Sequence, residues 1–342
     1  MRITQIMLSK GWGGAERIFI DLVKGLAEQG IQVQVIMDRR FQQKNQLEGI
    51  DNITPSFIRP LSHIDFIAAA KLCKKIKQFA PDVVHCHLSR GALMGGRAAA
   101  KLTLPAVVTT HNNIKLKYCR NINHFIVLTE AQRDYLEGQG VSGEVIAKIP
   151  NFSNFKPVSE IKKRTNPVFV AYGRMVPKKG FVDLIHAFRL IAEKQPDAKL
   201  LIGGEGVGRD ELQKLLREFG LQQQVSFVGW VEDVKQHLEQ GAVFVLPSRD
   251  EPFGIVLLEV MACAVPIVTT KTTGACEILS DETAYFADVS NPVSLSSAMA
   301  LALQSPERWQ KAEAALALFK RHYRKGSVIP TTIEHYQNIL AG

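Results

Sequence analysis

Short apolar runs alternate with amphipathic helical patterns along the whole chain, and this alternation is typical of α/β proteins. The runs are rich in β-branched residues and bounded by glycine, proline or polar residues, so we predict that they form buried parallel strands. They cover residues 2–9, 31–37, 82–88, 105–111, 124–130 and 145–151 in the first half, and 167–173, 198–204, 225–229, 242–248 and 265–270 in the second. The repeat predicts two doubly wound sheets, which bind ligands at the carboxyl ends of their strands.

A polar stretch near residues 155–166 separates the two halves, and we predict a linker there. The first domain is expected to cover residues 1–160. The second is expected to begin with the strand at residue 167 and to cover residues 161–326.

The C-terminal region shows a long helical pattern over roughly residues 294–323. Gly326 and Pro330 interrupt the pattern, because proline removes a helical hydrogen bond and clashes with the preceding turn. We therefore predict a short last helix over about residues 331–340. It lies within a segment, residues 327–342, that we expect to cross back onto the first domain.

The stretch "RDEPFGIVLLEVMACAVPIVTT" places two glutamates in the most apolar part of the chain. Glu251 follows a buried strand, and Glu259 falls about one turn into a helix predicted to begin near Ile255. The free N–H groups of Gly254, Ile255 and Val256 form an anion site at that helix N-terminus. Because an unpaired buried carboxylate costs several kcal/mol, we predict that Glu259 binds ligand hydroxyls, such as those of a ribose. The alternative is a structural role, in which Glu259 pairs with a buried arginine or caps a backbone group.

Two cations follow another predicted strand, in the motif "AYGRMVPKKG". Arg174 and Lys179 are expected to reach the same strand edge as Glu251, where they suit a diphosphate. A cation about 4 Å from a phosphate charge contributes roughly 4 kcal/mol at an effective dielectric constant of 20. The alternatives are that both are solvated surface cations, or that Lys178 takes the place of Lys179.

The first half offers weaker signals at its own strand ends. Gly13 and Gly14 lie between the first strand and the next helix, where glycine lets the backbone approach a ligand closely. His111 ends a strand and can bond a substrate oxygen or a backbone group. His85 and His87 share a strand face, but with no nearby carboxylate and no D-x-D motif we predict no metal site.

The composition, 46% hydrophobic and 22% charged, is that of a globular chain without a run long enough to span a bilayer. The N-terminus lacks the apolar region of a signal peptide. Five cysteines, an odd number without CxxC spacing, favour a reducing compartment over a disulfide or zinc framework. We therefore expect a cytoplasmic protein.

The net charge of +9 is unevenly distributed. Residues 1–165 hold 24 Lys and Arg against 13 Asp and Glu, a balance of +11, whereas residues 166–342 hold 18 against 20, a balance of −2. A basic first half suggests a phosphorylated acceptor, an acidic lipid or a nucleic acid as partner, or simply a soluble basic surface. Nucleic acid ranks last, because no aromatic residues are interleaved with the cations.

The motifs together resemble those of glycosyltransferase family 4, a group of retaining enzymes with the GT-B fold. The resemblance covers nearly the whole chain in the family's order, and the E-x7-E spacing of the last motif is the most specific part. The matching motifs are "GGAER", "THNN", "VLTEAQRDYL", "IPNFSNF", "GRMVPKKG", "LIGGEG", "FVGW" and "EPFGIVLLEVMACAVPIV". The resemblance implies two Rossmann-like domains facing a central cleft, with the acceptor mainly on the first and the nucleotide-sugar mainly on the second.

The resemblance also implies a role for each matching residue. Arg174 and Lys179 are similar to the diphosphate clamp, Glu259 to the ribose-binding acid, and Glu251 to the acid that holds hydroxyls of the donor sugar. His111 resembles the active-site histidine that contacts the donor sugar. The remaining donor contacts would come from Gly13 and Gly14, from Val228 beside the nucleobase, and from the backbone of Phe253, Gly254, Ile255 and Val256.

The implied reaction is a front-face substitution with retained configuration, in which the leaving diphosphate takes the acceptor's proton. No cofactor and no metal are implied beyond the nucleoside-diphosphate sugar itself. The acceptor is expected to be an anionic or lipid-linked glycan, such as a lipopolysaccharide core, with the enzyme in peripheral contact with the inner membrane. No nucleic acid partner is expected.

Three residues depart from the family pattern: Ala264 and Ala275 replace glycines, and Asn112 follows His111 in place of Asp or Gly. The added methyl groups would narrow the sugar pocket or shift the loop near Gly274. Other functions stay open: an epimerase or hydrolase of nucleotide-sugars on this fold, or a non-catalytic binder of them. An NAD dehydrogenase is disfavoured, because "GGEGVGRD" has Arg209 where the dinucleotide fingerprint needs its third glycine.

Overall fold

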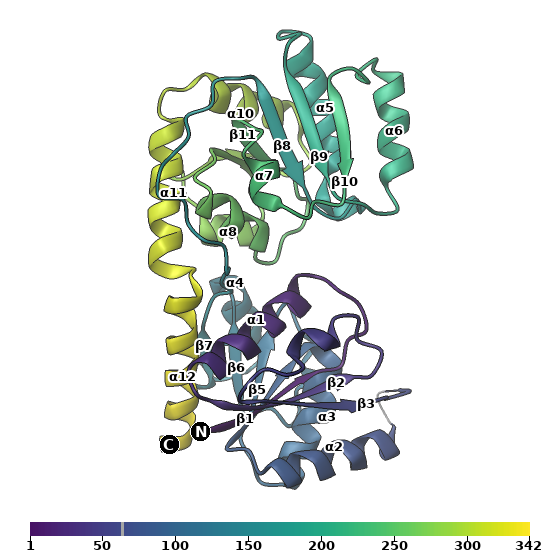
Figure 1. Cartoon of the computed structure of the whole chain (residues 1–342), viewed down its shortest axis with the longest axis vertical. Helices are drawn as coiled ribbons and strands as arrows, with labels where there is room; N and C mark the ends of the chain where they lie inside the picture. The colour runs from purple at the N-terminus through teal and green to yellow at the C-terminus, as the bar shows by residue number, and fades with distance from the viewer. Residues whose placement is uncertain (63–64) are drawn as a thin grey trace. The chain divides into compact units, whose positions relative to one another are not determined.

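The computed structural model describes residues 1–62 and 65–342, and the chain divides into two compact units (Figure 1). Unit 1 comprises Met1–Asn154 with Lys325–Gly342, and unit 2 comprises Phe155–Arg324. Each unit is an α/β domain built on one parallel sheet, as the alternating pattern predicts. The C-terminal segment is therefore part of unit 1, although it follows unit 2 in the sequence.

The sheet of unit 1 has seven parallel strands in the order β3-β2-β1-β4-β5-β6-β7. The order reverses direction between β1 and β4, which is the switch point where doubly wound sheets bind ligands. The strands are β1 (Arg2–Met7), β2 (Gln32–Asp38), β3 (Ile53–Ile58), β4 (Val83–His87), β5 (Ala106–Thr110), β6 (His124–Val127) and β7 (Ile146–Lys148).

Helices cover both faces of this sheet, because successive side chains of a buried strand point to opposite sides. Ile3 and Met7 of β1 pack with α1 (Gly14–Glu28) and α12 (Lys325–Ala341). Ile6 of the same strand packs on the other face. That face is covered by α2 (Phe66–Phe79), α3 (Leu88–Lys101) and α4 (Glu130–Glu137). The 3₁₀ helices of this unit are η1 (Lys44–Leu47), η2 (Leu116–Tyr118) and η3 (Gly143–Val145).

Unit 2 repeats the plan with six parallel strands in the order β10-β9-β8-β11-β12-β13, so its switch point lies between β8 and β11. The strands are β8 (Val168–Tyr172), β9 (Lys199–Gly203), β10 (Val225–Gly229), β11 (Val243–Leu246), β12 (Ile267–Thr270) and β13 (Tyr285–Ala287). The helices are η4 (Pro177–Lys179), α5 (Phe181–Ala192), α6 (Arg209–Glu218), α7 (Val234–Leu238), α8 (Ile255–Ala262), α9 (Thr273–Ile278), α10 (Pro292–Gln304) and α11 (Arg308–His322). The main core lies where α5, α6 and α10 pack on one face of the sheet.

The C-terminal prediction was wrong in two respects. The long helix is two helices, α10 and α11, because Pro306 follows the first and disfavours helical backbone at the residue before it. The last helix begins at Lys325 and continues through Pro330. Pro330 lies on the exposed side of α12, whereas Val328 and Ile329 are buried in unit 1, and this burial stabilises the helix despite the lost hydrogen bond.

Ala264 departs from the family's glycine at a backbone position that favours glycine. It follows the last turn of α8 with φ of +50°, in the left-handed region. The N–H of Ala264 bonds the carbonyl of Met261 at 3.1 Å, as in a helix C-terminal cap. The residue is therefore at the end of α8 remote from Gly254, and its methyl group affects the backbone of the cap rather than the loop near Gly274.

We expect Ala264→Gly to stabilise the protein by about 1 kcal/mol, because glycine adopts this conformation without the steric cost that Ala264 bears. The urea midpoint of unfolding measures the change. Ala262→Gly is the matched control, since it introduces glycine into the helical last turn of α8 and should destabilise by about 1 kcal/mol. Equal destabilisation by both substitutions would contradict the cap assignment.

Candidate active site

The N-terminus of α8 lies at the edge of unit 2 where β11 ends. Gly254 is its N-cap with φ of +97°, and the helix begins at Ile255 as predicted. The first N–H groups of a helix have no partner within it, so those of Ile255 and Val256 are available to an anion. A Cβ on Gly254 would lie 3.3 Å from Cγ of Glu251, and the backbone of this residue is in the left-handed region that favours glycine. Glycine therefore lets the loop that carries Glu251 fold against the start of the helix.

The loops that follow β8 and β11 are fastened together at this switch point. The N–H of Arg249 donates to the carbonyl of Lys178 at 2.8 Å. The guanidinium of Arg249 also donates to both carboxylate oxygens of Asp183, in the first turn of α5, at 2.7 Å each. A bidentate pair of this kind fixes direction as well as distance. The motifs "GRMVPKKG" and "RDEPFG" therefore form one joined surface.

Lys179 and Glu251 meet on this surface, with the Nζ of Lys179 donating to Oε2 of Glu251. Their side chains are only 14% and 12% exposed. Lys178 is different: its side chain is 44% exposed and its Nζ lies 3.9 Å from Asp250. The structure thus places Lys179 beside Glu251 and Lys178 outward. Arg174 follows β8 and is exposed.

Glu259 lies in α8 and is 1% exposed. The hydroxyl of Tyr172, the last residue of β8, donates to its Oε2. Tyr172 was not predicted as a site residue, although its place directly before the "GR" motif at a strand end was a signal. A carboxylate can accept several hydrogen bonds, so the bond with Tyr172 is compatible with a ligand, and the ribose contact stays a prediction.

Val228 occupies a bulge in the edge strand β10. The register with β9 shifts between Phe227 and Gly229, so Val228 is left outside the regular ladder. The residue is 45% exposed, and Gly229 after it has a positive φ of +73°. Backbone groups released from a ladder can bond a ligand, as the predicted contact with a nucleobase needs.

The unit 1 residues of the predicted site lie at the ends of β1 and β5. Gly13 is the N-cap of α1 and Gly14 its first residue, so Gly14 belongs to the helix rather than to the loop before it. His111 follows β5 and is buried. Its Nε2 lies 3.1 Å from Nδ1 of His87, at the end of the neighbouring strand β4.

A buried chain of hydrogen bonds assigns the protons of these histidines. Gln5 accepts from Nε2 of His87 at 2.8 Å through its amide oxygen, while its amide nitrogen donates to the hydroxyl of Tyr336 at 3.1 Å. In a neutral His87 the other nitrogen, Nδ1, must therefore accept from Nε2–H of His111. Nδ1 of His111 is then an acceptor, and it has no partner among the described residues. His111 is thus suited to accept a hydrogen bond from a ligand hydroxyl.

Burial keeps the histidines of this chain neutral. Desolvation lowers the pKa of His111 to about 4 and that of His85 to about 3, and it holds the pKa of His87 well below the ordinary value. The charge that a neighbouring histidine would carry lowers the pKa of His85 and His87 further. Nδ1 of His85 lies 2.6 Å from the hydroxyl of Tyr336 on α12. The C-terminal helix therefore belongs to the same network as the strand ends.

The next question is whether the side chains of the predicted site could hold a metal ion. Across residues 1–62 and 65–342, no group of three or more His, Cys, Asp or Glu side chains is placed to hold a metal ion. Of the three neighbouring histidines, His85 and His87 have both ring nitrogens engaged with Gln5, Thr109, Tyr336 or His111, and only Nδ1 of His111 has no partner among the described residues.

Comparisons with known proteins agree on one enzyme class. Residues 12–155 match the family model described as glycosyltransferase family 4, and residues 153–316 match the model described as glycosyl transferases group 1. The lipopolysaccharide core biosynthesis glycosyltransferase LpsE of Rhizobium meliloti is 30% identical over 282 residues, covering 80% of each chain. LpsD of the same organism is 27% identical and covers 84% of each chain.

Solved structures show the same fold. The Anabaena protein Alr3699/HepE in complex with UDP superposes with a TM-score of 0.87 at 20% identity, over 99% of this chain and 100% of that one. The lipopolysaccharide outer core galactosyltransferase WaaB, in its apo form, gives a TM-score of 0.77 at 18% identity over 98% and 99%. These matches confirm the predicted GT-B fold of two Rossmann-like domains.

Proposed function

The chain belongs to glycosyltransferase family 4, within the group 1 glycosyl transferases, and on that premise we propose that it transfers a sugar from a nucleoside-diphosphate sugar to an anionic, lipid-linked acceptor, with retention of configuration. The observation that carries the proposal is the joined surface at the switch point of unit 2. There Lys179, Glu251 and the N-terminus of α8 lie together on two fastened loops. N–H groups that bind anions, next to carboxylates that accept hydrogen bonds, suit a ligand that carries both phosphates and hydroxyls.

The donor's groups divide naturally among these residues. The diphosphate is bound by the ammonium of Lys179, by the exposed guanidinium of Arg174 and by the first N–H groups of α8. Glu259, held by Tyr172, takes the ribose hydroxyls, and Glu251, oriented by Lys179, takes hydroxyls of the sugar. Complexes of the HepE protein with UDP and UDP-glucose support a nucleotide-sugar as the donor class.

Catalysis in this scheme consists of positioning and charge stabilisation. Negative charge develops on the leaving diphosphate, where Lys179, Arg174 and the helix N-terminus are preorganised to stabilise it. The acceptor hydroxyl attacks from the face that the diphosphate leaves and gives its proton to a diphosphate oxygen. His111 is neutral, so it accepts a hydrogen bond from a donor-sugar hydroxyl through Nδ1 rather than supplying a charge.

We expect Glu259→Ala to weaken UDP binding by roughly tenfold to a hundredfold, because a ribose hydrogen bond to a charged acceptor contributes about 1.5–3 kcal/mol. Glu251→Ala is the comparison: it removes a sugar contact, so it should lower turnover with little change in the affinity for UDP. Calorimetric titration of UDP into each folded variant measures the affinity. Unchanged UDP affinity in Glu259→Ala would contradict the ribose assignment and leave the bond with Tyr172 as its structural role.

The acceptor class rests on charge, on the names of the relatives and on one exposed surface. LpsE and LpsD are named for lipopolysaccharide core biosynthesis. In unit 1, the large apolar side chains of Leu61, Phe66 and Ile67 are 78%, 84% and 71% exposed beside the start of α2. The rest of α2 carries four lysines and no acidic residue. Exposed apolar anchors next to a basic helix suit the interface of an anionic membrane.

No helix in the described part of the chain is long and apolar enough to cross a bilayer.

We expect the protein to co-sediment with vesicles that contain anionic lipid, and to do so less as the salt concentration rises. The triple variant Leu61→Ser, Phe66→Ser and Ile67→Ser should lose most of the binding. Val293→Ser with Leu301→Ser, two exposed apolar residues of α10, is the matched control and should bind as the unmodified chain does. Equal recovery on neutral vesicles would overturn the electrostatic part of the proposal.

A further inference from the structure

A cavity of about 420 Å³ lies at the switch point of unit 1. Its two walls are the segment that follows β1 and the segment that follows β4, the strands between which the sheet order reverses. The lining residues are Leu8, Ser9, Lys10, Leu88, Ser89, Arg90 and Gly91. A crevice in this place is where doubly wound sheets bind ligands, and the volume is within the range of small-molecule sites.

The backbone of the second wall is shaped to present donors. Leu88 has φ of +60°, a left-handed conformation that is costly for leucine and that turns the chain sharply from β4 into α3. The N–H groups of Ser89 and Arg90 then fall in the first turn of the helix, where neither has an intrahelical partner, whereas the N–H of Gly91 is the first to reach back to the N-cap residue His87. A Cβ on Gly91 would lie 3.0 Å from the carbonyl oxygen of Ile6, so glycine is what lets α3 press this close to β1.

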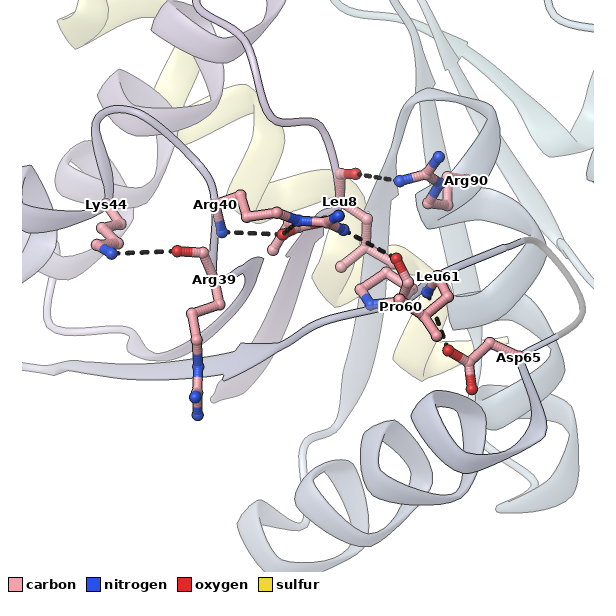
Figure 2. A network of polar contacts seen from close by, with 9 residues as sticks. Leu8, Arg39, Arg40, Lys44, Pro60, Leu61, Asp65 and Arg90 are labelled. Carbon is pink, nitrogen blue, oxygen red and sulfur yellow. Dashed lines mark hydrogen bonds and ion pairs between the residues drawn. The ribbon is translucent and has the colours of Figure 1, made fainter.

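The polar side chains that line the cavity are cationic (Lys10 and Arg90) or hydroxylic (Ser9 and Ser89), and none of the lining residues is acidic. The guanidinium of Arg90 reaches the opposite wall, where one N–H donates weakly to the carbonyl of Leu8 at 3.4 Å (Figure 2). Arg90 and Lys10 form no ion pair within residues 1–62 and 65–342. Oγ of Ser9 is buried and has no partner in the same residues.

The surroundings reinforce the positive potential. Asp38 at the end of β2 is already paired, because Arg40 donates to both of its oxygens at 2.9 and 2.7 Å. The Nζ of Lys44 donates to the carbonyl of Arg39 (Figure 2), and neither residue lines the cavity. A concave cationic surface focuses field lines and raises the local concentration of an anion.

We propose that this cavity, through Arg90, Lys10, Ser9 and the first turn of α3, binds an anionic group, a phosphate or a carboxylate, of the acceptor. The inference rests on the proposed function, since it names the part of unit 1 that recognises the acceptor's charge. The diphosphate of the donor is served by a separate set of residues in unit 2, namely Arg174, Lys179 and the N-terminus of α8. The two switch points thus bind two different anions.

Titration of the full chain with inorganic phosphate, followed by amide NMR and repeated in the presence of saturating UDP, tests the inference. Phosphate should shift the amide signals of Ser89, Arg90 and Gly91, with the same affinity whether or not UDP is bound. Arg90→Gln should weaken phosphate binding by roughly tenfold and leave the affinity for UDP unchanged. Lys101→Gln, which removes a charge from the exposed end of the same helix, is the matched control and should change neither.

Three outcomes would overturn the inference. These are no shift at the start of α3, equal weakening by Lys101→Gln, and competition between UDP and phosphate for these amides, which would assign the cavity to the donor's diphosphate. A second arm of the experiment titrates the chain with glucose 6-phosphate and, separately, with glucose. Only the phosphorylated sugar should shift these amide signals. A failure of the proposed function gives a different pattern: UDP binds nowhere, while phosphate still shifts these signals.

Discussion

Lys179→Ala is expected to lower kcat/KM for sugar transfer by about a thousandfold. A cation about 4 Å from a phosphate charge contributes roughly 4 kcal/mol at an effective dielectric constant of 20, which corresponds to about three powers of ten in rate. Lys179 is only 14% exposed and touches Glu251, so its removal also leaves that carboxylate without its ammonium partner. Kinetics with the nucleotide-sugar that binds measure the loss.

Lys178 is the matched control for this prediction, because it is the adjacent lysine and carries the same charge. Its side chain is 44% exposed and its contact with Asp250 is long, at 3.9 Å. Lys178→Ala should therefore change kcat/KM by less than about threefold, as expected for a surface ion pair. Equal losses in the two variants would show a general effect of charge and contradict the placement of Lys179 at the diphosphate.

Acidification is expected to destabilise unit 1 steeply. In the unfolded chain His85, His87 and His111 titrate near their ordinary pKa of about 6.5, whereas in the folded unit burial lowers the pKa of all three, to about 3 for His85 and about 4 for His111. Below pH 6.5 the unfolded state therefore binds more protons than the folded state, and stability falls as the pH falls. Each histidine contributes about 1.4 kcal/mol per pH unit, so the free energy of unfolding should drop by about 4 kcal/mol between pH 7 and pH 5.5.

Urea unfolding at a series of pH values measures this slope. His85→Gln should reduce the slope between pH 6.5 and pH 5 by about one proton. His322→Gln is the control, since this histidine is exposed at the end of α11 and should leave the slope unchanged. A urea midpoint that does not move between pH 7 and pH 5.5 would contradict the neutral, buried assignment of the three histidines.

Most of the strands that the sequence predicted correctly are buried and have continuous apolar runs, although β7 and β10, at sheet edges, were predicted as well. Two strands, β3 and β13, were not predicted, and both lie at the edges of their sheets. In β3 the segment "ITPSFI" contains Pro55, which a central strand would exclude but an edge strand tolerates. In β13 three residues are too few to show a period. Edge strands depend on their neighbours, which the local pattern does not record.

The candidate site divides in a similar way. Strand-end motifs located Lys179, Glu251 and the start of α8, because a parallel sheet brings the ends of its strands to one edge. The partners that orient these groups were not predictable. Tyr172 and Glu259 are 87 residues apart, and Gln5 and Tyr336 are 331 residues apart. Such pairs are determined by strand order and by the return of α12 to unit 1, and neither follows from periodicity.

The most direct test of the central assignment is a calorimetric titration of the full chain with UDP, GDP, ADP and NAD. If the joined loops of unit 2 hold the donor's diphosphate, one nucleoside diphosphate will bind with one site per chain, and Lys179→Ala will weaken that binding by at least tenfold. Binding of NAD alone, or of none of the four, would contradict the assignment of Lys179, Glu251 and Glu259 to a nucleotide-sugar.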